Sequence, residues 1–210
     1  MKEKNTEIHP LEPFLPPHAT VLMLGSFPPK KEKWSMDFYY PNFINDMWRI
    51  YGWVFFGDKG YFLSADKKTF DPERIKAFLW EKGIALTDTG KEVMRLKDNA
   101  SDKFLEIVET IDLADVLGRI PQCRTVLTAG QKATETFLSM VPVKMPATGG
   151  STPFTFNGRE MRLYRLPSSS RAYPKPVEAK GEVYRKVFEE IGIMGDDGST
   201  NDLFAREKTN

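Results

Sequence analysis

The sequence predicts one α/β domain, a three-layer α/β/α arrangement around a mainly parallel sheet of about four strands. Two observations favour it: short apolar runs alternate with segments of helical spacing, and the apolar runs are short enough to be buried strands. The predicted strands are 21–24, 84–88, 125–129 and 161–166, and the predicted helices are 72–82, 101–118, 131–140 and 178–191.

Local signals place several of these boundaries. Asp71-Pro72 and Ser101 are suitable first residues of helices. Asn157-Gly158 stands between apolar runs within 147–165, which is a hairpin signal. The hairpin adds one antiparallel strand to the parallel core.

Length and composition limit the possible classes of protein. A chain of 210 residues with 40% hydrophobic residues can bury one sizeable core, which we place at 20–193, between a proline-rich arm (1–19) and a flexible tail (194–210). The single cysteine, Cys123, excludes a disulfide framework, a cysteine-based zinc site and an iron–sulfur cluster. The polar N-terminus and the lack of a long apolar run predict a soluble, cytoplasmic protein that does not enter a membrane, and we expect a monomer.

Two loops follow the ends of predicted strands. The first begins with Gly25-Ser26-Phe27-Pro28-Pro29 and continues into a segment rich in aromatic and amide side chains, from Phe38 to Trp48. The second is Leu166 to Arg171, with the sequence LPSSSR. Loops at the carboxyl ends of parallel strands commonly build ligand sites. Rings that stack and amides that form hydrogen bonds suit a flat polar ligand.

These motifs resemble the uracil-DNA glycosylase superfamily, most closely its hypoxanthine-DNA and mismatch-specific branches. The resemblance rests on GSFPP at 25–29, on FYY at 38–40 through Asn45 to WRI at 48–50, and on LPSSS at 166–170. Weaker similarities lie at 83–88 and 100–102, so that the motifs span about residues 20 to 190 in the family's order.

The resemblance implies a monofunctional DNA glycosylase that hydrolyses the bond to a deaminated base, hypoxanthine or uracil, without metal or cofactor. It assigns the catalytic amide to Asn45. The implied base-binding residues are Gly25, Ser26, Phe27 and Tyr40. Asn42 is included with them and is also a rival for the catalytic role, because Phe43 replaces the family's proline and a proline stands at 41.

The sequence departs from the family at two positions. Phe27 stands where much of the superfamily has an acid or amide that handles the water, and Leu166 stands where it often has histidine. Neither side chain can polarise water or stabilise a departing base. Two other functions therefore stay open: a non-catalytic member that binds nucleic acid or a nucleobase, and a nucleoside or nucleotide hydrolase.

DNA binding requires contacts to phosphate, because the net charge is only +1. We expect these contacts from Lys30, Lys31 and Lys33, and from Ser168, Ser169, Ser170 and Arg171. Either Arg171 or Tyr173 is suited to fill the gap left by a flipped base.

Simpler interpretations accompany these assignments. Asn45 is also a suitable cap for the helix that carries Trp48. Asp88 ends a predicted strand at the sheet edge that carries the two loops. It could titrate there, but it is expected mainly to accept a hydrogen bond from a loop N–H.

Asp37 and Asp46 are expected at the surface, although either could supply a general base. His9 and His18 precede the predicted core and are expected to have no role.

Overall fold

The computed structural model describes residues 6–96 and 104–194. Its main sheet has five strands in the order β3-β2-β6-β8-β7, and all neighbours except β7 and β8 run parallel. The bounds are β3 (Ile84–Asp88), β2 (Val21–Gly25), β6 (Thr125–Ala129), β8 (Arg159–Leu166) and β7 (Ser151–Phe156). The prediction of about four parallel strands with one added antiparallel strand is confirmed.

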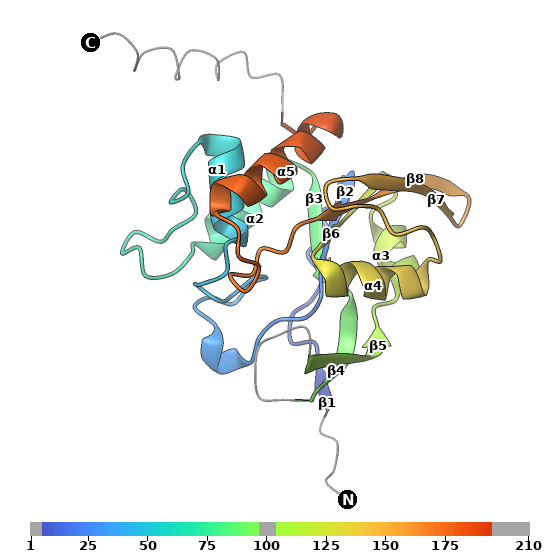
Figure 1. The fold of residues 1–210 in the computed structure, drawn as a ribbon, viewed down its shortest axis with the longest axis horizontal. Coiled ribbons are helices and arrows are strands. Elements are labelled where there is room, and N and C mark those ends of the chain that lie inside the picture. The colour runs from blue at the N-terminus through green and yellow to red at the C-terminus, as the bar shows by residue number, and fades with distance from the viewer. Residues whose placement is uncertain (1–5, 97–103, 195–210) are drawn as a thin grey trace, which may run out of the picture.

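Helices cover both faces of this sheet, which gives the three predicted layers (Figure 1). One face packs against α1 (Met47–Phe56), α2 (Pro72–Glu81) and α5 (Val177–Glu190), and the other against α3 (Leu113–Arg119) and α4 (Gln131–Met140). Because successive strand residues point to opposite faces, Met23 joins the first core, and Leu22 and Leu24 join the second.

The predicted start of helix α2 and the predicted hairpin turn are both confirmed. Asp71 caps α2, since its carboxylate accepts from the backbone N–H groups of Glu73 (3.1 Å) and Arg74 (3.0 Å). Asn157 and Gly158 join β7 to β8 and have φ values of 49° and 76°. Positive φ at both positions is what a two-residue hairpin turn of type I′ requires.

The predicted helix 101–118 is wrong over Leu105–Thr110 and correct only in its last turns, where α3 lies. Its described part forms strand β5 (Leu105–Thr110) and then the short helix α3, which begins after Asp112. Leu105–Thr110 has β-branched residues and a half-exposed surface, so it pairs readily with β4 (Gly90–Arg95). Ser101, the expected helix start, lies outside the described residues, as does the weaker similarity at 100–102.

A second, antiparallel sheet lies beside the main one, with the order β1-β4-β5. Strand β1 (Thr6–Ile8) and strand β4 were not predicted. Part of the proline-rich arm thus packs against the domain: β1 pairs with β4, and Phe14 bridges Leu86. Of the predicted tail only residue 194 is described. Within 6–96 and 104–194 no helix is both long and apolar enough to span a membrane.

Candidate functional site

A cleft of about 480 Å³ lies at the carboxyl edge of the four parallel strands. Each of these strands contributes to it directly or through the loop that follows. The lining comprises Gly25–Pro29, Tyr40–Asn42, Ile44, Asn45, Asp88, Ala129 and Ser168–Tyr173. The structure therefore brings together both predicted loops, with Asn45 and every predicted base-binding residue.

The floor of the cleft requires glycine at position 25. A Cβ added there would lie 2.1 Å from Asp88 Oδ1 and 3.0 Å from Tyr40 Oη. The first distance is shorter than any real contact, so the carboxylate occupies the space above the Gly25 backbone. Asp88 is 5% exposed, and its carboxylate is part of the cleft wall.

Tyr40 enters the cleft with a strained backbone. Its φ of 52° is in the left-handed region, which a non-glycine residue seldom adopts. The neighbouring chain is fixed, because the Trp48 indole N–H donates to the Tyr39 carbonyl at 3.0 Å. The Tyr40 ring also meets Trp48 edge-on, with ring centroids 6.1 Å apart. Such strain at a cleft is typical of functional sites.

Both candidate amides bond the local backbone. Asn42 Oδ1 accepts from the Ile44 N–H at 3.1 Å, and Asn45 Oδ1 accepts from the Met47 N–H at 2.9 Å. The Asn45 bond satisfies a donor at the start of α1, as the simpler interpretation expected. A carbonyl oxygen has two lone pairs, so this bond leaves Asn45 Oδ1 able to accept once more.

Arg49 holds the loop that carries these amides. Its guanidinium donates to the carbonyls of Phe43 (2.7 Å) and Asn45 (3.0 Å), and it lies over the Phe43 ring at 4.7 Å. Burial, and then the nearby charge of Arg171, lower the pKa of Arg49. The charge of Asp46, which lies 3.3 Å from Arg171 Nε, partly offsets this lowering.

The serine loop, Ser168 to Arg171, is stabilised by hydrogen bonds from backbone N–H groups to its own serine hydroxyls. Ser168 Oγ accepts from the Ser170 N–H, and Ser170 Oγ accepts from the Ala172 N–H, both at 3.2 Å. The Ser169 carbonyl accepts from the Asp46 N–H at 3.0 Å, which joins this loop to the start of α1. Of the seven residues predicted to contact phosphate, the four in this loop, Ser168 to Arg171, line the cleft.

Asp46 is buried, so the prediction that it lies at the surface is wrong. Its carboxylate is 3.0 Å from the fully buried Lys180 Nζ on α5 and 3.3 Å from Arg171 Nε. Lys180 also donates to the Ser170 carbonyl at 2.9 Å. Asp46 therefore fixes the serine loop and is not among the residues that line the cleft. Asp37, by contrast, is exposed, as expected.

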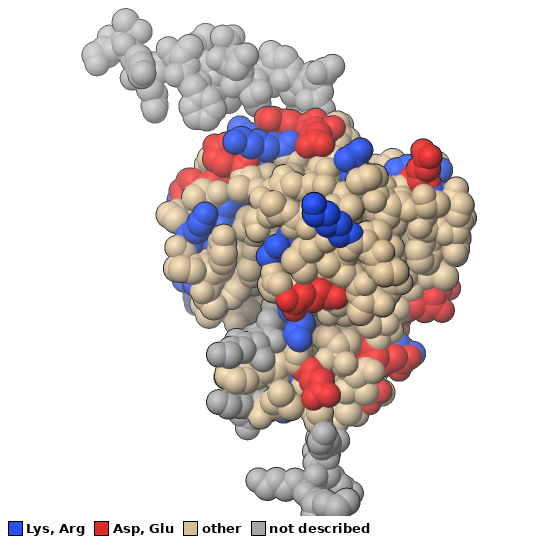
Figure 2. Space-filling view, turned by 45° about the vertical axis from the view of Figure 1, so that its right-hand side comes forward, with Lys and Arg blue, Asp and Glu red and all other residues tan. Residues whose placement is uncertain are grey.

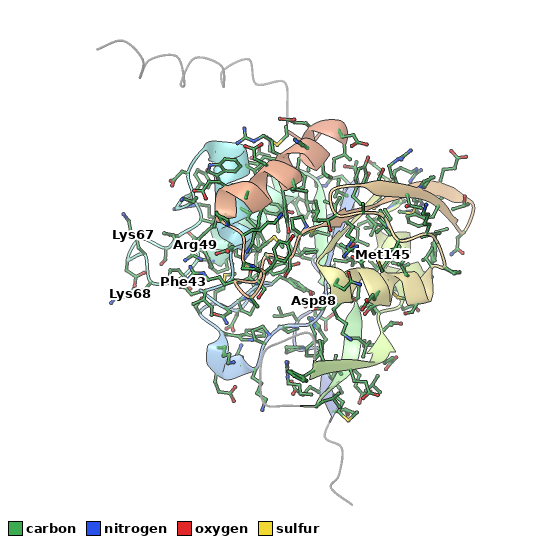
Figure 3. The ribbon with its side chains drawn as sticks, viewed as in Figure 1. Phe43, Arg49, Lys67, Lys68, Asp88 and Met145 are labelled. Carbon is green, nitrogen blue, oxygen red and sulfur yellow. The ribbon has the colours of Figure 1, made fainter. Side chains whose placement is uncertain are left out.

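His9 contacts the cleft wall, although it precedes the predicted core. Its Nε2 lies 2.9 Å from Asp88 Oδ2. No local pattern indicates this contact, because the two residues are 79 positions apart. In the view of Figure 3, Asp88 lies between the Phe43–Arg49 pair and α4. His18 instead bonds the Trp80 carbonyl at 2.8 Å and is exposed.

The three predicted DNA-binding lysines are outside the cleft lining. Lys31 and Lys33 lie on an exposed 3₁₀ turn, Lys31–Lys33, that follows the lining residue Pro29, and Lys31 is paired with Asp37. On the face drawn in Figure 2, basic and acidic side chains are interspersed among uncharged surface. Among the described side chains, no group of three His, Cys, Asp or Glu is arranged to hold a metal ion.

Comparison with solved structures identifies proteins of similar fold. No protein-family model and no curated protein matches the chain. A solution structure of a protein from Methanosarcina acetivorans, named a "putative uracil DNA glycosylase", superimposes with a TM-score of 0.54 at 23% identity. The match covers 84% of this chain and 97% of that one. The chain therefore shares the α/β fold of that protein.

Proposed function

We propose that this chain is a monofunctional DNA glycosylase that removes a deaminated base, hypoxanthine or uracil. The observation that carries the proposal is the cleft itself. It joins Tyr40, Asn45 and the Ser168–Arg171 loop at one edge of the parallel sheet. A base extruded from DNA needs a ring to stack on, polar groups for its edge, and donors for its phosphates. The motif resemblance and the fold of the relative support the same conclusion.

Asn45 would position the attacking water. Its amide is held in place by the Met47 N–H, and the second lone pair of its oxygen is suited to accept a hydrogen bond from water. An amide cannot remove that proton near neutral pH, so its contribution would be orientation. The burial and ion pairing of Asp46 leave that carboxylate unsuited to act as the base. We therefore expect a slow enzyme that depends on a good leaving group.

Negative charge grows on the base as the glycosidic bond breaks. Backbone around Ser26 and Phe27, which follows β2 into the cleft, would face a base carbonyl and stabilise that charge. The serine loop and Arg171 would hold the flanking phosphates. Uracil and hypoxanthine leave more readily than cytosine and adenine, so they suit a site with little acid–base power.

The site favours base removal without strand cleavage. Among the described residues that line the cleft there is no lysine to form a Schiff base. Lys180, the buried lysine nearby, is bonded to Asp46 and to the Ser170 carbonyl. We expect an intact strand with an abasic site as the product.

One observation favours a second candidate, a protein that binds a base in DNA without removing it. Phe27 and Leu166 supply no polar group, and the only acid in the cleft lining among the described residues, Asp88, already accepts a hydrogen bond from His9. This candidate predicts DNA binding with no release of base.

Single-turnover excision by Asn45→Ala and Asn42→Ala separates the two amides. Each variant would be compared with the wild type on oligonucleotides that carry uracil or hypoxanthine, with binding measured in parallel. We expect Asn45→Ala to lower the excision rate about 100-fold, and Asn42→Ala to affect it less, because positioning a reactant accounts for effects of this size. Loss only with Asn42→Ala would move the catalytic role to Asn42. Equal activity of both variants and the wild type would contradict the assignment.

A further inference from the structure

The two oxygens of the Asp88 carboxylate have different surroundings. Oδ2 accepts from His9, and Oδ1 stands above Gly25, at the floor. The two side chains are 10% and 7% exposed. One carboxylate oxygen therefore lies above the floor of the cleft, and the other is held by a residue of the N-terminal arm.

His9 can hold this carboxylate in either of its protonation states. Its Nδ1 lies 3.2 Å from the Leu11 N–H and 3.0 Å from the Leu11 carbonyl. The neutral ring accepts from Leu11 N–H at Nδ1 and donates from Nε2. The cation donates to the Leu11 carbonyl and also donates from Nε2. Asp88 keeps an N–H donor in both cases.

The histidine ring packs against two aromatic rings, of which Phe27 lines the cleft. Phe27 meets it edge-on at 5.0 Å, and Tyr39 stacks on it at 5.8 Å between centroids. Tyr39 in turn donates to the Glu12 carbonyl at 3.1 Å, so a second part of the arm supports the pair. Burial and the charge of Asp88 raise the pKa of Tyr39, which therefore stays a neutral phenol.

The strand order places Asp88 at the far end of the cleft from the serine loop. Asp88 ends β3, and Ser168 follows β8, three positions away across the sheet. Neighbouring strands lie about 4.8 Å apart, so the two ends are separated by roughly 14 Å. That span is comparable to one nucleotide. With its phosphate at the serine loop, a nucleotide would present the outer edge of its base to Asp88, and its sugar would lie nearer the middle.

We propose that His9 is a positioning residue that holds Asp88 as a hydrogen-bond acceptor for the ring N–H at the outer edge of the bound base. The inference rests on the proposed function and adds a determinant of base choice to it. Uracil and hypoxanthine both carry such an N–H. A base whose ring nitrogen is methylated cannot donate it and should be bound and removed less well.

The test compares uracil with 3-methyluracil in the same oligonucleotide, for wild type, His9→Phe and His9→Gln. Wild type should prefer uracil by about tenfold or more, the usual effect of a hydrogen bond to a charged group. His9→Phe should lose most of this preference, and His9→Gln, which retains an N–H donor, should recover it. His18→Phe is the matched control, because His18 bonds Trp80 away from the cleft lining, and should behave as wild type.

A purely structural role for His9 predicts a different result. His9→Phe would then lower activity on both bases equally, and His9→Gln would not restore the preference. Either that outcome or an unchanged preference of His9→Phe for uracil over 3-methyluracil would overturn the inference. The proposed function would still stand if the wild type excised uracil.

A binding measurement decides the inference if the wild type removes neither base. The chain has two histidines, so NMR signals of the His9 ring can be assigned by comparison with His9→Gln. Free uracil should shift those signals in the wild type and not in Asp88→Ala. Shifts that persist in Asp88→Ala, or no shift at saturating uracil, would contradict the role of the pair.

Discussion

At the scale of single residues, the cleft depends on groups that leave no room for substitution. Gly25 shows this most directly. Its missing side chain is what allows the Asp88 carboxylate and the Tyr40 hydroxyl to approach the end of β2. Glycine is required here for space rather than for an unusual backbone conformation, since Gly25 is not among the described residues with positive φ.

Gly25→Ala should therefore displace Asp88. We expect a loss of about 1–3 kcal/mol in the free energy of unfolding, as is usual for overpacking, together with a loss of base binding. Urea unfolding measures the first and oligonucleotide binding the second. Gly118→Ala is the control: nothing lies within 4 Å of a Cβ there, and the position is helical, so the variant should be more stable by about 0.5–1 kcal/mol. Similar effects of the two variants would contradict the account.

Cys123 reports on the core at the same scale. The thiol is buried, and burial raises its pKa to about 11. Because the thiolate is the reactive form, the folded protein should resist alkylation at pH 8, where an ordinary cysteine reacts. Iodoacetamide labelling followed by mass spectrometry should show slow modification in buffer and rapid modification in urea. Rapid labelling of the folded protein would mean that Cys123 is accessible.

At the scale of elements, the cleft depends on joining two loops to α5. Lys180 is fully buried on that helix and bonds both Asp46, before α1, and the Ser170 carbonyl. The start of α1 is thereby fixed to the loop that follows β8. This arrangement holds Asn45 and the Ser168–Arg171 loop next to each other in the cleft lining.

Lys180→Met should cost about 3–5 kcal/mol of unfolding free energy, because it leaves the buried Asp46 carboxylate with only a partly exposed Arg171 partner. The double variant Asp46→Asn/Lys180→Met should recover much of this loss, since neither buried charge remains. Urea denaturation of the two single variants and the double variant measures the coupling. Additive losses in the double variant would show that the pair does not act as a unit.

The sequence predicted elements where local pattern and tertiary role agree. The strands 84–88 and 125–129 and the helix 131–140 match the structure, because their apolar residues all face one of two cores. Leu105–Thr110 was misassigned because its pattern is also compatible with a helix. Pairing with β4, a contact distant in sequence, selects the strand.

At the scale of the whole molecule, the position of the cleft could be predicted from the sequence, but the contact between His9 and Asp88 in its wall could not. Parallel strands that end in Gly25 and Leu166 must meet at one edge, so their loops had to be close together. The contact between His9 and Asp88 depends instead on the arm pairing through β1 with β4, which had no local signal. The burial of Asp46 was likewise hidden, because its partner Lys180 is 134 positions away.

The net charge of the whole molecule also bears on the proposed DNA binding. With a net charge of +1, affinity for DNA should depend on a few local cations and fall as salt is added. Arg171→Gln should weaken binding to all sequences alike and reduce the slope of log affinity against log salt by about 1. Fluorescence anisotropy over a salt series measures both. An unchanged slope would show that Arg171 makes no phosphate contact.

Direct detection of free base under single-turnover conditions tests the central claim. The wild type in excess would be incubated with oligonucleotides containing uracil or hypoxanthine, and released base and strand integrity would be measured together. The account predicts one free base for each abasic site, with the strand intact until alkali is added. DNA bound at saturating enzyme with no base released would contradict it and favour a protein that binds without cutting.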